Sequence, residues 1–258
     1  MSTIVFEKKG QVARVIFNRP EVYNSFNRPM GRALLKALQV CADDADIRAV
    51  YLSGTGKAFC AGQDLNELQE PSPATFDELL GNYYNPIILQ ITALKKPVVA
   101  AVNGVAAGAG ANLALACDLV VASSSANFIQ AFSKIGLVPD SGGTFNLPRL
   151  VGKQRATALM MLGEKISATA ARDMGMIYEV YPDESFAESS WNLAEKLAAM
   201  PTYALALIKQ ALQQSGEHTL KQQLDLELNM QGLAGASEDF AEGVKAFLEK
   251  RPPHFSGK

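Results

Sequence analysis

The sequence predicts an α/β fold that ends in a helical region. Short runs of β-branched residues alternate with helix-patterned stretches as far as 177–182, and only helical patterning follows. Such alternation is typical of helices packed on a sheet. With 48% hydrophobic and 19% charged residues, the chain can bury a large core. We expect the α/β core over 1–195 and a helical region over 196–258.

The N-terminal elements are a hairpin and a helix. Two β-rich runs, 4–7 and 12–18, flank a glycine-containing turn at 8–10, which indicates a hairpin. Over 29–41 the apolar residues recur at helical spacing and predict one buried stripe. Cys41 lies on this stripe, so we expect a core residue rather than a nucleophile.

The next stretch predicts a strand, a loop and a longer helix. The run IRAVYLSG at 47–54 has the composition of a strand, and the glycine-punctuated loop at 55–65 leads into a short helix. A helix follows over 82–96, where Pro86 disturbs the pattern.

Residues 97–117 carry no charge, and this run is longer than the roughly 18 residues that suggest a membrane span. Its interior is rich in alanine and glycine, which favour lipid only weakly. A β-branched run, a turn at Asn103-Gly104 and a helix at 108–118 account for it better. We expect a buried strand and a buried helix, and no membrane span.

The remaining elements follow in order along the chain. They are strands at 119–123 and 127–131, a turn-rich segment at 134–144, helices at 153–162 and 168–174, and a strand at 177–182. Three helices are then expected over 184–251. Pro201 opens one of them as a first-turn proline, and Ser237 precedes the last.

Charge and cysteine content exclude several classes of protein. The net charge is -2, without long basic runs, which argues against nucleic-acid binding. Cys41, Cys60 and Cys117 form no CxxC pair, so neither a disulfide framework nor a zinc site is expected. The N-terminus lacks the apolar segment of a secretory signal. We expect a cytoplasmic protein that binds neither nucleic acid nor a membrane.

The motifs of several enzyme classes are absent from the sequence. The two histidines, His218 and His254, lie far from any glycine-framed serine, and no G-x-S-x-G elbow occurs. HExxH and the P-loop are missing, and Leu113 stands where a dinucleotide motif starting at Gly108 needs its third glycine. We therefore expect no metal and no redox or nucleotide cofactor.

Two glycine-rich segments, 59–64 and 104–111, each join a strand to a helix. Backbone N–H groups at helix starts have no intrahelical partner and lie at the positive end of the helix dipole. Two of them directed at one carbonyl oxygen would form an oxyanion hole. The alternative is that both segments are ordinary tight turns.

Asp140 follows an apolar run and Pro139, so it is a candidate for a desolvated base with a raised pKa. The alternative is a cap for a helix starting near Ser141, the commoner role of aspartate before a helix. Three aromatic residues either line an acyl pocket or fill the core: Tyr83, Tyr84 and Phe132.

Taken together, these segments resemble the crotonase (enoyl-CoA hydratase/isomerase) superfamily. The similar segments are 17–26, 53–65, 96–118, 136–152, 171–180 and 242–255. The resemblance implies a crotonase-like spiral of ββα turns with a C-terminal helical trimerisation region. It also implies a homotrimer or homohexamer, an acyl-CoA thioester substrate, and no cofactor apart from the CoA carried by the substrate.

The resemblance also implies the site residues, carried over by motif. The thioester oxygen would lie between the backbone N–H groups of Gln63 and Ala109. The implied substrate-binding residues are Val22, Asn24, Ser25, Ala61, Gly62, Asp64, Leu65, Tyr83, Asn112 and Phe132. Lys245, Lys250 or Arg251 would meet the CoA phosphates across a subunit boundary, or else lie on a solvated helix face.

Two residues depart from the hydratase pattern. Hydratases of this superfamily carry glutamates where this chain has Asn112 and Phe132, neither of which can take a proton from water. Asp140 occupies the position at which isomerase branches place an aspartate, so the resemblance implies that Asp140 is the base. Several motifs most resemble the branch that converts ring 1,2-epoxyphenylacetyl-CoA to an oxepin-CoA in phenylacetate catabolism.

Three alternatives stay open at this point. The same base and oxyanion hole would serve a general enoyl-CoA Δ3,Δ2-isomerase. A hydrolytic homologue would use Asp140 as a nucleophile, although no histidine lies near the motifs to act as general base. A non-catalytic acyl-CoA-binding homologue in a multienzyme assembly would share the same segments.

Overall fold

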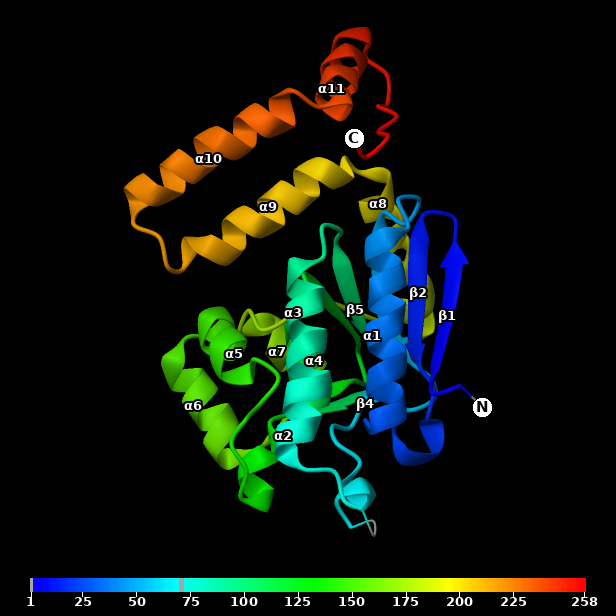
Figure 1. The fold of residues 1–258 in the computed structure, drawn as a ribbon, viewed down its shortest axis with the longest axis vertical. Helices are drawn as coiled ribbons and strands as arrows, with labels where there is room; N and C mark the ends of the chain where they lie inside the picture. The colour runs from blue at the N-terminus through cyan, green and yellow to red at the C-terminus, as the bar shows by residue number, and fades with distance from the viewer. Residues whose placement is uncertain (1, 70–71) are drawn as a thin grey trace.

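Two β-sheets form the core of the computed structural model, which describes residues 2–69 and 72–258 (Figure 1). The first sheet has the strand order β1-β2-β3-β5-β7-β10, and the second has the order β4-β6-β8-β9. Their bounds are β1 Ile4–Lys9, β2 Val12–Phe17, β3 Ala49–Gly54, β4 Ala58–Cys60, β5 Val98–Val102, β6 Val105–Ala107, β7 Leu119–Ser123, β8 Asn127–Ile129, β9 Lys165–Ser167 and β10 Glu179–Tyr181. The β1–β2 and β8–β9 pairs are antiparallel, and the other pairs are parallel.

From β3 to β8, consecutive strands alternate between the two sheets. β3, β5 and β7 enter the first sheet, and β4, β6 and β8 follow them into the second. Helical segments then return the chain to the first sheet, as α4 (Ala109–Leu115) does after β6. This repeated path is the ββα spiral that the resemblance implies.

The N-terminal hairpin and helix agree with the sequence patterns. β1 and β2 pair through a turn at Gly10, whose φ of +56° suits glycine. The helix α1 (Arg28–Asp43) begins after Asn27, whose side chain accepts a hydrogen bond from the Met30 N–H at 3.0 Å. Cys41 is fully buried on its inner stripe, as expected.

The helix predicted over 82–96 begins earlier and has three parts. α2 (Phe76–Leu79) runs into a π-helical turn at 80–84 and then into α3 (Asn85–Ala93). Pro86 follows the π-helical turn directly, and the Asn85 N–H donates to the carbonyl of Leu80 instead of to the residue four positions back. The irregular turn next to Pro86 agrees with the expectation that this proline disturbs the helix.

The uncharged segment 97–117 forms β5, β6 and α4, so it contains a second strand that the sequence patterns missed. The turn before β6 is tight, because a Cβ on Gly104 would lie 2.2 Å from the carbonyl oxygen of Lys57. β4 was missed in the same way inside the predicted loop at 55–65. Nowhere in residues 2–69 and 72–258 is a helix both long and apolar enough for a membrane span.

The C-terminal part has four helices in the fully described stretch 183–249, rather than the three expected. They are α8 (Asp183–Ala199), α9 (Thr202–Ser215), α10 (Leu220–Gly235) and α11 (Glu238–Glu249). A reciprocal capping box between Thr219 and Gln222 starts α10 and separates it from α9. In Figure 1, α9, α10 and α11 extend beyond the sheets at one end of the molecule.

Four further helical segments lie between β8 and β10. The 3-10 turn at 131–135 follows β8, and α5 (Gly143–Val151), α6 (Lys153–Leu162) and α7 (Ala168–Asp173) come after it. The segment 134–144, expected as turns only, therefore ends in the first residues of α5. Asp140 lies between the 3-10 turn and α5.

Candidate functional site

The loops at 22–26 and 61–64 run side by side at the edge of β4. The Phe26 N–H donates to the carbonyl of Gly62 at 2.7 Å, and the Asp64 N–H donates to the carbonyl of Phe26 at 2.8 Å. The Ala61 N–H donates to Tyr23 at 3.1 Å. Two segments far apart in the sequence, both predicted to hold CoA, are therefore joined by backbone hydrogen bonds.

Asn24 fastens the first of these loops to the core. Its side chain is fully buried and donates to the carbonyls of Thr55 and Ala58, at 2.9 and 2.7 Å. Its Oδ1 accepts from the Arg19 N–H at 2.8 Å. Because the amide is fully used inside the protein, Asn24 shapes the loop. Ser25 likewise donates its hydroxyl within the loop, to the carbonyl of Val22 at 2.7 Å.

The start of α4 packs directly on the segment that contains Gln63. A Cβ on Gly110 would lie 2.2 Å from the carbonyl oxygen of Cys60, so only glycine permits this approach. A Cβ on Gly62 would lie 3.7 Å from the backbone nitrogen of Ala109. In the described part of the chain, the N–H groups of Gln63 and Ala109 donate no hydrogen bond. The two predicted oxyanion donors are thus unpaired and come from neighbouring segments.

The side chain of Gln63 is held by other residues and leaves its N–H unpaired. Its Oε1 accepts from the Tyr84 hydroxyl at 2.9 Å, and its Nε2 donates to Glu67 at 3.0 Å. Burial raises the pKa of Tyr84 well above its usual value, and the nearby charges of Cys60 and Asp140 add to this effect. Tyr84 therefore stays protonated and acts as a hydrogen-bond donor.

The two tyrosines differ in where their side chains lie. Tyr84 contacts Gln63, whereas the hydroxyl of Tyr83 accepts a hydrogen bond from Arg32 at 3.0 Å. The ring of Tyr83 also packs closely against Gly31 of α1. The structure therefore brings Tyr84 to the Gln63 segment. Tyr83, which was predicted to bind the substrate, lies in the π-helical turn and packs against α1.

Asp140 does not cap a helix, so the capping alternative is wrong. α5 begins after Gly142 and has no side-chain cap. The Asp140 carboxylate instead accepts from the Ser141 hydroxyl at 2.8 Å. Burial raises the pKa of Asp140, and the hydrogen bonds from Ser141 and from its own N–H lower it by less. A carboxyl group with a raised pKa is suited to general base catalysis.

Asn112 and Phe132 lie at the two positions where the hydratase pattern has glutamate. Asn112 is fully buried in α4, and its amide donates to the backbone carbonyl of Asp140 at 2.8 Å. Phe132 is buried in the 3-10 turn, and its ring would lie 3.8 Å from a Cβ built on Gly108. The structure thus places both residues around the start of α4, and neither supplies an acid or a base.

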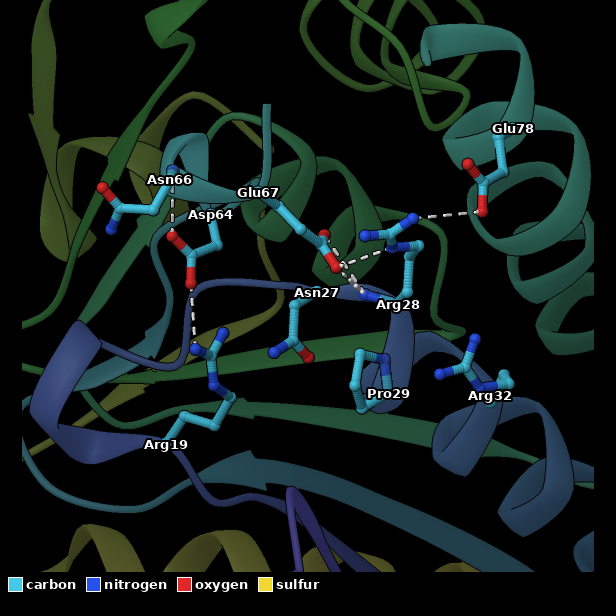
Figure 2. A pocket seen from close by; sticks show the side chains of 9 residues that line it. All are labelled: Arg19, Asn27, Arg28, Pro29, Arg32, Asp64, Asn66, Glu67 and Glu78. Atoms are coloured by element: carbon cyan, nitrogen blue, oxygen red, sulfur yellow. Dashed lines mark hydrogen bonds and ion pairs between the residues drawn. The ribbon is translucent and has the colours of Figure 1, made fainter. Parts of the chain in front are cut away.

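A polar pocket of about 440 Å³ lies next to the paired loops (Figure 2). It is lined by Arg19, Asn27, Arg28, Pro29, Arg32, Asp64, Asn66, Glu67 and Glu78. Arg19 pairs with Asp64 at 2.9 Å, and Arg28 pairs with Glu67 at 3.1 Å. The pocket therefore offers guanidinium groups whose charge is partly balanced by carboxylates.

The arginines of this pocket are not among the predicted site residues. A usable signal is the tripeptide Asn-Arg-Pro, which occurs at 18–20 and again at 27–29, on either side of the first loop. Of the predicted residues, Asp64 lines the pocket, and Leu65 follows it with a half-exposed side chain.

The basic residues predicted to meet CoA phosphates lie elsewhere. Lys245 is in α11, and Lys250 and Arg251 follow at its end. In Figure 1, α11 lies at one end of the molecule, whereas β4 lies within its main body, away from α11. Arg251 is also paired with Glu242 at 2.6 Å. Within one chain, these residues are not brought to the candidate site.

The two-sheet ββα spiral, with glycine-framed N–H groups at the start of α4, defines a crotonase-fold protein. The chain belongs to the enoyl-CoA hydratase/isomerase family, whose sequence profile matches residues 7–258. The predicted superfamily and fold are therefore confirmed. Members of this family are enzymes that act on acyl-CoA thioesters.

Individual relatives carry different activities in their names. The chain is 47% identical to the 1,2-epoxyphenylacetyl-CoA isomerase of Escherichia coli (strain K12), with all of both chains covered. It is also 47% identical to the "Probable enoyl-CoA hydratase" of Rhodobacter capsulatus, covering 99% of this chain and 98% of the relative. The crystal structure of an enoyl-CoA hydratase from Polaromonas sp. JS666 superposes with a TM-score of 0.90 at 35% identity, covering 98% and 99% of the two chains.

Proposed function

We propose that this protein is an acyl-CoA isomerase in which Asp140 is the single base and the N–H groups of Gln63 and Ala109 form the oxyanion hole. The observation that carries the proposal is the carboxyl group of Asp140, whose pKa is raised by burial. Its backbone is hydrogen-bonded to α4, the helix that begins at Ala109.

In the proposed reaction, the thioester carbonyl oxygen accepts hydrogen bonds from the two N–H groups. Asp140 takes a proton from the carbon next to the carbonyl, and the electron pair forms an enolate whose oxygen these donors stabilise. Asp140 then returns the proton at a different carbon, so no atom is gained or lost. The reaction needs no metal and no redox group, and CoA enters as part of the substrate.

The proposed substrate is ring 1,2-epoxyphenylacetyl-CoA, and the product is an oxepin-CoA of phenylacetate catabolism. The full-length similarity to an isomerase named for this substrate supports the choice. The bond between the two epoxide carbons breaks, so that the six-membered ring and the epoxide become one seven-membered oxepin ring. The enolate electrons form a double bond between the side-chain carbon and the ring, and the proton held by Asp140 goes to a ring carbon. For a straight-chain 3-enoyl-CoA, the same groups would move a proton along the chain and give the 2-enoyl isomer.

Hydration is not proposed, although one relative of equal identity is named as a hydratase. Adding water to a double bond needs groups that take a proton from water and deliver one to carbon. Asn112 uses its amide in two buried hydrogen bonds, and Phe132 is a hydrocarbon. What the site keeps is one base that suits a proton shift within the substrate.

The paired loops are the proposed binding site for the CoA moiety. Their backbone hydrogen bonds form a rigid border, and the pocket beside them carries Arg19, Arg28 and Arg32. Guanidinium groups bind phosphate through paired N–H donors.

We also propose a homotrimer or homohexamer, because α11 presents an apolar surface that a single chain leaves exposed.

The test is a side-by-side assay of purified protein with the ring-epoxide thioester and a straight-chain 3-enoyl thioester. We expect isomerisation of the ring epoxide with the larger kcat/KM. Asp140→Asn should lower kcat at least ~100-fold and change the affinity for the CoA ester little. Preference for the 3-enoyl thioester would shift the assignment to the Δ3,Δ2-isomerase. Retention of more than about a tenth of kcat in Asp140→Asn would remove Asp140 as the base.

A further inference from the structure

We propose that Asn112 is a positioning residue that holds the Asp140 carboxylate in place, and that Gln130 fixes the orientation of the Asn112 amide. The inference rests on the proposed role of Asp140 as the base. It assigns a purpose to the amide that stands where the hydratase pattern has a glutamate.

Three buried polar groups are joined in one chain of hydrogen bonds. Gln130 Nε2 donates to Asn112 Oδ1 at 2.8 Å, and Asn112 Nδ2 donates to the backbone carbonyl of Asp140 at 2.8 Å. Asn112 is fully buried, and Gln130 is 1% exposed. Because the amide accepts on one side and donates on the other, its two ends cannot be exchanged.

The turn that carries Asp140 needs a support of this kind. The next two residues, Ser141 and Gly142, both have left-handed backbones, with φ of +51° and +72°. Ser141 is not a glycine, so this conformation is unfavourable unless its surroundings enforce it. The Asp140 carbonyl receives a second hydrogen bond from the Gly143 N–H at 2.9 Å. The turn is thus held by α5 on one side and by Asn112 of α4 on the other.

The neighbouring residues are arranged around the Asn112 amide. A Cβ on Gly143 would lie 2.2 Å from Asn112 Nδ2, so only glycine leaves room for the amide at this point. In the described part of the chain, Gln130 Oε1 is a buried acceptor without a partner. Gln130 therefore leaves one of its own polar atoms unpaired while its donor orients Asn112, an arrangement that is unfavourable for stability alone and common at functional sites.

A carboxylate at position 112 could not perform this task. It has no proton to donate to the Asp140 carbonyl, and two acceptors would then face each other. An added negative charge beside the turn would also raise the pKa of Asp140 further. The asparagine thus connects the helix that begins at the oxyanion donor Ala109 to the turn that carries the base. One side chain sets the spacing between them.

The test compares Asn112→Leu, Asn112→Asp and Asp140→Asn with the wild-type enzyme, using the thioester on which the wild type is most active. Asn112→Leu should lower kcat at least ~10-fold, with KM changed less than threefold, because a base displaced by about 1 Å is still close to a normally bound substrate. The acidic limb of the pH–kcat profile should move to lower pH in Asn112→Leu, since a released turn admits water to the carboxyl group. In Asn112→Asp it should move to higher pH.

Ser190→Ala is the matched control. Ser190 lies in α8, which covers the first sheet, and the change removes its buried hydrogen bond of 3.0 Å to Tyr51 of β3. This variant should leave kcat and the pH profile unchanged. Should Asn112→Leu not fold, Gln130→Met replaces it, because it frees the Asn112 amide without touching α4. It is expected to lower kcat and move the limb in the same direction.

The two proposals fail in different ways. If Asp140→Asn is inactive while Asn112→Leu, or its replacement, keeps kcat within twofold with an unmoved acidic limb, the role of Asn112 is overturned and Asp140 remains the base. If Asp140→Asn stays active, the proposed function itself is wrong. Equal loss of kcat in the Asn112 variants and in the control would also overturn the inference, because it would show a general loss of folded protein.

Discussion

Burial gives Asp140 its chemical character. It lies in a half-buried turn, and removal from water raises the pKa of its carboxyl group more than the Ser141 hydroxyl lowers it. The same burial makes the ionised group costly for the folded state. A residue with this conflict between stability and charge is a typical catalytic group.

Asp140→Asn should therefore stabilise the protein at neutral pH while it removes activity. The folded carboxyl group keeps its proton to higher pH than the unfolded one, so the wild-type free energy of unfolding falls as pH rises from the ordinary value of 3.8 through the raised pKa. Asparagine does not titrate and escapes this loss. We expect a gain of about 1 kcal/mol at pH 7 in urea unfolding. The gain should vanish well below pH 3.8, where the Asp140 carboxyl group is protonated in both the folded and the unfolded state. A variant less stable than wild type at pH 7 would contradict this.

Hydration of a 2-enoyl-CoA should be negligible. Asn112 and Phe132 supply no acid or base, and each general acid–base group typically contributes ~10²–10⁴-fold. With crotonyl-CoA as substrate, loss of the 2-enoyl absorbance should stay below about a hundredth of the isomerisation rate. Rapid hydration of crotonyl-CoA by the wild-type protein would contradict the mechanism with a single base.

Among the elements, the paired loops and the C-terminal tail are fixed by buried polar side chains. Arg48 follows α1 and is 4% exposed. Its guanidinium donates to the carbonyls of Met200 and Phe255, at 2.6 and 2.7 Å, and to the Thr202 hydroxyl at 2.8 Å. One side chain of the core thus holds both the start of α9 and the tail after α11.

Arg48→Met should release these segments. The buried carbonyl groups would lose a charged donor, and such losses cost about 1–3 kcal/mol for each group left unsatisfied. We expect the free energy of unfolding to fall by about 3 kcal/mol, and hydrogen exchange to rise first in the segment after residue 250. Lys221→Met serves as control, because it breaks only an exposed ion pair with Asp225 and should cost less than about 0.5 kcal/mol. Equal effects of the two changes would show that Arg48 does not hold the tail.

At the scale of the whole molecule, the prominent feature is an apolar surface far from the candidate site. A second cavity of about 410 Å³ lies between α9, α10 and α11, with mostly apolar walls. Phe247 and Leu248 beside it are 82% and 73% exposed. A contiguous apolar surface of this kind usually marks a protein interface.

The protein should therefore be an oligomer at micromolar concentration. Light scattering should give three or six times the chain mass of 27.7 kDa. Phe247→Glu combined with Leu248→Glu should dissociate the assembly, because it places charges in an apolar contact. Met161→Glu, an equally exposed apolar position on α6, should leave the mass unchanged. A wild-type mass equal to one chain would refute the expectation.

The sequence by itself determined the alternation of strands and helices, the core position of Cys41 and the helical C-terminal part, because strand and helix periodicity and turn residues act over a few neighbours. The family and its ββα spiral were predicted instead from the resemblance of whole segments to a known superfamily. Local signals also explain why two strands and one helix boundary were missed. β4 and β6 are short strands framed by glycines, and the capping box at Thr219 divides one expected helix into two.

Only the tertiary structure decided how the site is put together. It brings Gln63 next to Ala109 because Gly62 and Gly110 allow backbones to touch, it buries Asp140, and it turns Asn112 toward the Asp140 carbonyl. It also gathers the arginines on either side of the first loop into one pocket. The physical reason is that the local patterns act only between residues close in the sequence. Which distant segments meet depends on close packing of the whole core.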